Sequence, residues 1–141
     1  MLKKVIFTIL ILGTIGGVIG YLMWNKPHKD IANTKEDFFI SATDLSKEYN
    51  ADETSANPKY LNKVIAVSGT VSEMQWENEE EPTVALSTGS EDNTVLCGFK
   101  KEFLNDIKHL KAGDSIKIKG KCDGINMFGG VVLTQCSLII E

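Results

Sequence analysis

The chain has 141 residues, of which 43% are hydrophobic, and 15 lysines against 19 acidic residues give it a formal net charge of −4. It contains no arginine, which disfavours a protein that follows a nucleic-acid backbone, because such proteins normally display a basic face rich in arginine. Three cysteines without a C-x-x-C motif exclude a thioredoxin-type redox pair, and two distant histidines do not suit a zinc site.

The first element in chain order is an uncharged, apolar run over residues 5–24, behind two lysines. In a helix this run rises about 30 Å, the thickness of the hydrocarbon core of a bilayer. A cleaved signal peptide is the alternative, but its apolar core is usually about 7 to 15 residues long and ends at small residues. This run ends in bulky residues, so we expect residues 1–24 to form an uncleaved transmembrane signal anchor.

Several residues within the anchor have a specific expected role. Tyr21 and Trp24 suit the membrane interface. The spacings Gly13 to Gly17 and Gly16 to Gly20 are small-xxx-small steps that permit two anchor helices to pack closely as a homodimer. The alternative is that glycine is simply common in membrane helices. We expect an inside N-terminus, which places the remaining domain in the periplasm of a single-pass bacterial inner-membrane protein. The marker residues are Val5, Gly13, Gly17, Tyr21 and Trp24.

Residues 25–62 are expected to form a polar linker followed by one amphipathic helix. Thr34 with Asp37 is typical of a helix N-cap, and a connector with a helical turn at Pro58 ends the segment. Apolar residues at helical spacing predict a stripe that packs over the end of a barrel. These residues are Phe38, Ala42, Leu45 and Tyr49.

From residue 63 onward, alternating hydrophobicity predicts five strands, at residues 64–71, 84–87, 94–99, 115–122 and 131–140. Gly69 predicts a bulge or bend in the first strand. A helical stripe over residues 103–110, ended by Gly113, separates the third strand from the fourth. This order predicts a mainly β domain over residues 63–141, a five-stranded OB-fold barrel with one inter-strand helix.

Three segments carry a resemblance to a known family. KYLNKVIAVSGTV at 59–71, AGDSIKIKGKCDG at 112–124 and VVLTQC at 131–136 resemble the tRNA_anti-like group of OB-fold domains. The resemblance covers residues 35–141 and implies a short exported or membrane-anchored bacterial protein. It implies no catalytic residues.

Strand alternation places Cys122 and Cys136 on the inward face of the last two strands. If these strands form a hairpin, the two thiols can oppose one another and an oxidising compartment can join them in a disulfide. The alternative is two buried free cysteines that pack as small hydrophobes. Cys97 is left unpaired in both cases.

Residues 73–81 contain five glutamates and are expected to form a solvated acidic loop, with a hard cation as the alternative ligand. Trp76 in this loop and three outward lysines are the candidate binding face. His109 is expected to be a solvated helix residue, and His28 lies in the linker. The lysines are Lys117, Lys119 and Lys121.

The sequence offers no nucleophile with a base, no phosphate-binding glycine loop, no metal site and no cofactor site, so it predicts a protein that is not an enzyme. The favoured function is a membrane-anchored, extracytoplasmic module that binds another protein or an unidentified ligand. Binding of single-stranded nucleic acid is the alternative, which the fold suggests and the net charge of −6 over residues 25–141 opposes. A haem or small-ligand chaperone is a third hypothesis, but the histidine and tyrosine that the cytochrome c haem chaperone carries beyond its last strand are not present here.

Overall fold

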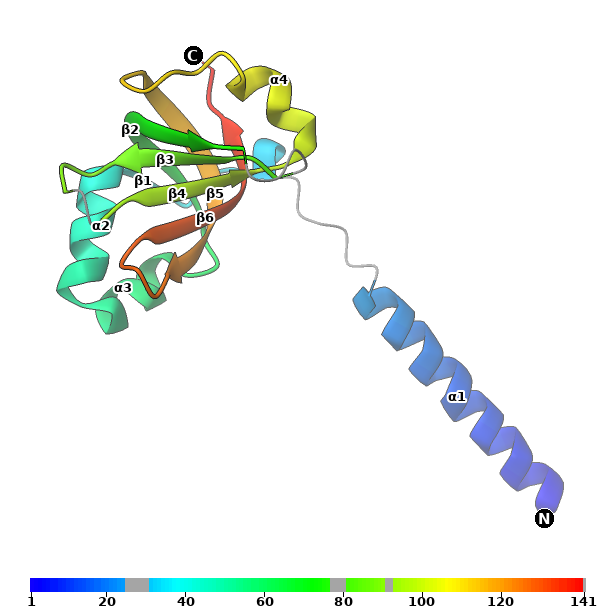
Figure 1. Cartoon of the computed structure of the whole chain (residues 1–141). Helices are drawn as coiled ribbons and strands as arrows, with labels where there is room; N and C mark the ends of the chain where they lie inside the picture. Colours follow the sequence, from blue (N-terminus) through cyan, green and yellow to red (C-terminus); the bar gives the residue numbers. More distant parts are fainter. Residues whose placement is uncertain (25–30, 77–80, 91–92, 141) are drawn as a thin grey trace.

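The computed structural model describes residues 1–24, 31–76, 81–90 and 93–140. Within them the fold is mainly β, with strands wrapped into a barrel and short helices around it (Figure 1). The strands are β1 (Phe38–Ser41), β2 (Val64–Gln75), β3 (Thr83–Ser87), β4 (Val95–Phe99), β5 (Ser115–Ile125) and β6 (Val131–Leu138). The helices are α1 (Leu2–Trp24), α2 (Ala42–Ala51), α3 (Glu53–Tyr60) and α4 (Leu104–Ile107), with 3₁₀ turns η1 (Ile31–Asn33) and η2 (Lys101–Phe103).

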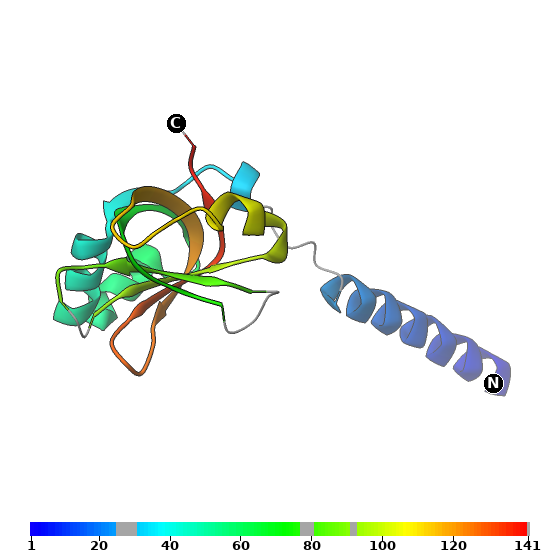
Figure 2. The same ribbon diagram turned by 45° about the horizontal axis from the view of Figure 1, so that its top comes forward.

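Five of the strands close into the predicted barrel. They follow the order β2-β3-β4-β6-β5, and β5 returns to pair with β2. Neighbouring strands are antiparallel except β4 and β6, which run parallel. Figure 2 shows β2 and β5 curving around the barrel interior. Four of the five predicted strands keep their positions within three residues, because alternation along a half-buried strand is a strong local signal.

Strand β2 is longer than predicted and changes neighbour along its length. Its first part lies between β1 and β5, and its second part, to Gln75, pairs with β3. The bulge lies between Val71 and Glu73 and not at Gly69. Gly69 serves close packing instead, because a Cβ there would lie 3.0 Å from the Cβ of Ala42. The glycine therefore lets α2 approach the barrel wall.

The amphipathic helix begins later than predicted. Residues 38–41 form β1, a sixth strand parallel to β2, and α2 begins at Ala42. Ser41, and not Thr34, caps the helix, since its Oγ accepts from the backbone N–H of Asp44 at 3.0 Å. Phe38 fits the helical stripe by spacing alone, and pairing with β2 overrides that local pattern. Ala42, Leu45 and Tyr49 do pack into the core as predicted.

Helices α2 and α3 are joined by a polar contact that faces away from the core. Glu48 accepts hydrogen bonds from the ammonium of Lys59 at 2.8 Å and from the hydroxyl of Tyr60 at 2.9 Å. The hydrogen bond from Lys59 lowers the pKa of the Glu48 carboxyl. Tyr60 also packs its ring at 6.1 Å from Tyr49, so this contact fixes α3 against α2 beneath the barrel.

The predicted helix at residues 103–110 is shorter than expected. A 3₁₀ turn, η2, leads into α4, which ends at Ile107, and only Ile107 of this segment is fully buried. Gly113 has a φ of +96° and makes the turn that precedes β5. The backbone N–H of Gly113 donates to the carbonyl of Val71, and the N–H of Val71 donates to the carbonyl of Asp114. These two hydrogen bonds join the turn to β2.

The N-terminal segment is helical, as α1, over residues 2–24. Its described side chains are exposed, including Leu12 and Val18. Within the part of the chain that the structure describes, no helix combines the length and apolarity needed to cross a membrane. The transmembrane element of the predicted fold is therefore not supported by this structure.

Residues 31–37, here called the N-terminal strap, are held against the outside of the barrel. Ile31 is 4% exposed, and the ammonium of Lys119 on β5 donates to the carbonyls of Ala32 at 2.8 Å and Thr34 at 2.9 Å. A lysine that alternation placed on the outer surface of β5 is thus used to attach the strap.

Replacing Lys119 by methionine should loosen the strap. Methionine keeps all but the last atom of the side-chain length and cannot donate to the two carbonyls, so we expect a loss of about 1 to 2 kcal/mol in the free energy of unfolding. Urea denaturation measures the loss, and faster amide exchange in residues 31–37 locates it. Lys121→Met is the control, because its exposed ion pair with Asp123 should contribute less than about 1 kcal/mol. Equal losses in the two variants would contradict the assignment.

Candidate ligand groove

A groove of about 620 Å³ crosses the outer face of β3, β4 and β6. This face is turned toward the viewer in Figure 1. In OB-fold barrels the ligand face is formed by the second and third barrel strands, here β3 and β4, with the loops between the first and second and between the fourth and fifth strands beside it. The side chains that shape the groove alternate with those of the core, because successive residues of a strand point to opposite faces. The outward residues are Thr83, Leu96, Gly98, Val132 and Thr134, with Gln135 beside them.

The floor of the groove is apolar at its centre and open beside it. Leu96 on β4 lies directly next to Val132 on β6 in the parallel register. Gly98, opposite Thr83 on β3, has no side chain to fill the space. A Cβ at Gly98 would meet only the carbonyl oxygen of Leu133, at 3.7 Å. The glycine is therefore not needed for packing, and its effect is to deepen the groove.

One wall of the groove is an irregular turn of backbone in β6. Gln135 has a φ of +53°, a left-handed conformation that is uncommon for a residue with a side chain. Cys97 pairs with Leu133 but Phe99 pairs with Cys136, so β6 contains an extra residue that the β4 ladder does not pair. Such strained residues cost about 1 to 3 kcal/mol and cluster at functional sites.

Among the described residues that line the groove, the charged side chains lie at one end. Glu81 precedes β3 and Lys100 follows β4, and a 2.9 Å hydrogen bond from the N–H of Phe99 to the carbonyl of Pro82 brings these ends together. The groove lining thus offers one cation beside one anion. It does not offer the row of cations that a phosphate backbone requires.

A second, more open hollow of about 650 Å³ lies where β1, β3 and β6 end. Serine and threonine side chains dominate its lining, including Ser68, Thr70 and Ser115. Lys117 contributes the only charged side chain among the residues that line it. We assign the ligand site to the groove because it lies on the barrel face, carries a strained wall and has an unfilled floor.

Each residue of the predicted binding face has its own neighbours in the structure. Lys119 binds the strap, Lys121 forms an ion pair with Asp123 at 3.0 Å, and Lys117 lies over the ring of Phe39. Trp76 is 45% exposed and follows the far end of β2, eight residues beyond the position paired with Lys117.

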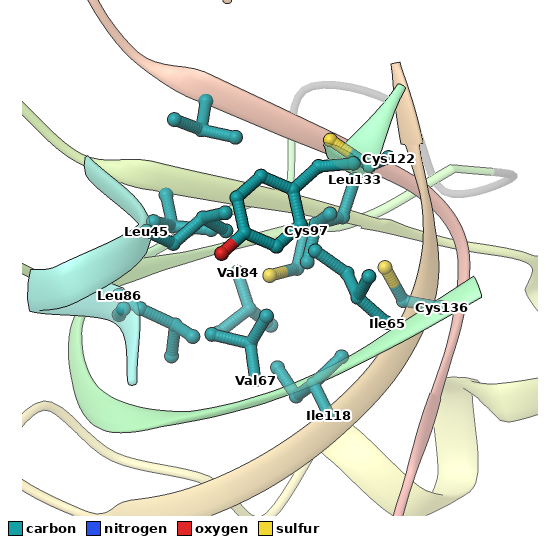
Figure 3. Close-up of a cluster of buried hydrophobic side chains, with 14 of the residues drawn as sticks. Leu45, Ile65, Val67, Val84, Leu86, Cys97, Ile118, Cys122, Leu133 and Cys136 are labelled. Atoms are coloured by element: carbon teal, nitrogen blue, oxygen red, sulfur yellow. The ribbon is translucent and has the colours of Figure 1, made fainter. Parts of the chain in front are cut away.

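All three cysteines are buried, free thiols inside the barrel, as Figure 3 shows. The inward orientation predicted from alternation is confirmed, but the predicted opposition of Cys122 and Cys136 is wrong. Register pairs Cys122 with Leu133, because bulges shift β5 against β6. Cys122 instead lies 3.4 Å from the hydroxyl of Tyr49. Burial raises the pKa of the Cys136 thiol, and the nearby Cys97 thiol raises it further.

We expect three reactive thiols in the unfolded protein. A maleimide added in denaturant to protein purified without reductant should label Cys97, Cys122 and Cys136, because register separates the only pair that alternation suggested. In the folded protein all three should resist the same reagent, since none has exposed surface. Intact mass spectrometry counts the labels. A species with a single label, mapped to Cys97, and a mass lower by two hydrogens would restore the predicted disulfide.

The described residues provide no metal-binding cluster. Glu73 lies in β2 and Glu81 precedes β3, while the other three glutamates of the predicted acidic loop, like His28, fall outside the described residues. His109 is exposed near the end of α4. No group of three potential ligands occurs among the residues with defined positions.

Sequence reasoning did not find the groove. Gly98 inside a predicted strand was a usable signal, since an interior strand glycine often marks a site where a ligand or backbone approaches closely. Gln135 gave no signal, because its conformation arises from the pairing of β6 with both β4 and β5. Met127 and Phe128, in the β5–β6 loop, are 90% and 82% exposed and were also missed.

Residues 1–138 match the tRNA_anti-like family. This is the family that the strand segments of the sequence resemble. The chain belongs to this family. The match includes residues of α1 as well as the barrel. No protein of curated function matches the chain.

Two solved structures, with TM-scores of 0.59 and 0.50, confirm the fold of this tRNA_anti-like domain. A Klebsiella pneumoniae lipoprotein, provisionally described as nucleic-acid-binding, aligns with 82% of this chain and 100% of its own at 15% identity and a TM-score of 0.59. A provisionally assigned aspartyl-tRNA synthetase of Leishmania major aligns with 83% of this chain at 11% identity and a TM-score of 0.50. An Entamoeba histolytica asparaginyl-tRNA synthetase aligns with 57% at 18% identity and a TM-score of 0.42. The chain spans only 22% and 21% of these two synthetases, whereas it spans the whole lipoprotein.

Proposed function

We propose that this protein is a non-catalytic binding module that takes its ligand in the groove across β3, β4 and β6. The observation that carries the proposal is the combination of an unfilled floor at Gly98 with a strained wall at Gln135. The unfilled floor forgoes packing, and the left-handed Gln135 costs conformational energy where β6 adjusts its register to β4 and β5. The described lining residues include no histidine and no cysteine, and their only hydroxyl groups are those of Thr83 and Thr134.

Site-specific photo-cross-linking of the full chain in living cells tests the proposal. A photoreactive residue at Thr83, which is half-buried in the groove, should form a defined adduct. The same residue at Ser90, exposed in the β3–β4 loop, should form none. Adding Gly98→Leu fills the floor and should remove the Thr83 adduct without lowering the melting temperature. Equal adducts from both positions, or an adduct that survives Gly98→Leu, would exclude the groove as the binding site.

We also propose that residues 5–24 hold the domain at the bacterial inner membrane, with the barrel in the periplasm. The proposal is supported by the length of the uncharged run, by the two lysines before it and by the family match, which begins at residue 1. Alkaline carbonate extraction should leave the full-length protein in the membrane pellet, and protease added to spheroplasts should digest the barrel. Release into the supernatant, or a mass that lacks the first 24 residues, would refute membrane anchoring.

Single-stranded nucleic acid is the second candidate ligand. The fold shared with a lipoprotein provisionally described as nucleic-acid-binding, and the family itself, favour it. The single cation of the groove and the charge of −6 over residues 25–141 oppose it. Nuclease treatment of the Thr83 adduct distinguishes a nucleic-acid ligand from any other ligand, since only a nucleic-acid adduct would be shortened.

A further inference from the structure

The loop between β5 and β6 presents two large apolar side chains to solvent. Met127 and Phe128 are 90% and 82% exposed. Exposed aromatic and methionine side chains are enriched at the contact sites of binding proteins. Residues 126–130 are here called the hairpin tip.

The hairpin tip is held rigid by its own hydrogen bonds. The side-chain oxygen of Asn126 accepts from the N–H of Phe128 at 3.0 Å and from that of Gly130 at 2.9 Å. The backbone N–H of Asn126 also donates to the carbonyl of Gly130, and the carbonyl of Asn126 accepts from the N–H of Gly129. A side chain presented on such a turn loses little conformational freedom when a partner covers it.

The hairpin tip does not line the groove but leads into β6, which supplies part of the groove floor. Phe128 precedes Val132 by four residues, a chain length of about 13 Å. The N–H of Val131 bonds to the carbonyl of Thr94, which joins the tip to the start of β4. The groove thus has a charged end at Glu81 and Lys100, and the hairpin tip lies beyond its opposite end.

We propose that the groove and the hairpin tip together bind an extended polypeptide segment, with an apolar side chain of that segment packed on Phe128. This inference rests on the proposed function of the groove and names its partner. Residues 124–140 carry no charge, so the surface between the tip and the Gln135 turn has nothing to neutralise phosphates. Thr83 and Gln135 supply donors and acceptors suited to backbone amides. Counted along the strands, the length from Lys100 to the tip is about 26 Å. An extended segment of roughly eight residues fits this length.

Peptide selection on the purified full chain tests the inference. The probe is a phage-displayed library of random 12-residue peptides. Selected peptides, once synthesised, should carry apolar or aromatic residues toward one end. Their affinity should fall about tenfold with Phe128→Ser, a typical loss for an aromatic anchor, and should be abolished by Gly98→Leu. Ile140→Ser removes another exposed apolar side chain outside the groove and should change nothing.

Three results overturn the inference. They are an absence of selected peptides, an affinity that Phe128→Ser leaves unchanged, and displacement of the peptides by a 12-residue oligothymidylate whose own binding needs Phe128. In each of these cases a Thr83 adduct that Gly98→Leu removes would still support ligand binding in the groove. Failure of the adduct itself would refute the proposed function, so the two failures are distinguishable.

Discussion

Replacing Gly120 by alanine should destabilise the barrel by about 2 kcal/mol, because the added Cβ would lie 2.6 Å from the sulfur of Cys136. Leu133 and Thr134 close the other sides of the site at 3.3 Å, so the methyl group has no direction in which to move. Both the glycine and the cysteine are buried between β5 and β6, where the wall cannot relax into solvent. Urea denaturation measures the loss, and the melting temperature should fall by roughly 10 °C.

Two further variants separate steric conflict from a general intolerance of alanine. Cys136→Ala removes the conflicting sulfur, so the double variant should recover at least half of the stability that Gly120→Ala loses. Gly98→Ala is the matched control, since that strand glycine has open space around its Cβ position and should change stability by less than about 0.5 kcal/mol. If Cys136→Ala only adds to the loss, the close contact between these two residues does not exist.

The cysteines and lysines show how much of this structure alternation alone can predict. The inward face of Cys122 and Cys136 and the outward face of Lys117, Lys119 and Lys121 follow from a period of two, and these orientations are observed. Alternation fixes the face of a strand but not its neighbour. The bulges between β5 and β6 decide which residues meet, and they depend on pairing between distant segments.

The groove escaped prediction for the same physical reason. Leu96 and Val132 become one floor only because β4 and β6 pair in parallel, although they are 36 residues apart in the sequence. Gln135 adopts its left-handed conformation because β6 must satisfy two neighbours with different registers. Phe38 shows the converse, since its local spacing fits a helix and its observed strand depends on β2. Local patterns thus predicted the barrel, and long-range pairing created the site.

Replacing Leu45 by alanine should have the largest effect on stability, a loss of about 3 to 4 kcal/mol in the free energy of unfolding. Leu45 on α2 has no exposed surface and lies in the same cluster as Val67 and Leu86 of the barrel. Truncation removes three carbon atoms beyond the Cβ and leaves a cavity that the surrounding strands cannot fill, because pairing fixes their backbones. Denaturation of the full chain in urea measures the loss.

The control is Leu61→Ala, because Leu61 follows α3 and is 36% exposed, so its truncation should cost less than about 1.5 kcal/mol. A large difference between the two variants would mean that α2 belongs to the core of the barrel and is not a detachable cover.

A protein that begins at residue 63 should then show no cooperative unfolding transition, because it lacks Leu45, Tyr49 and Tyr60, which fill one end of the barrel. A small effect of Leu45→Ala together with a cooperative truncated protein would show the opposite, that the five strands are stable alone.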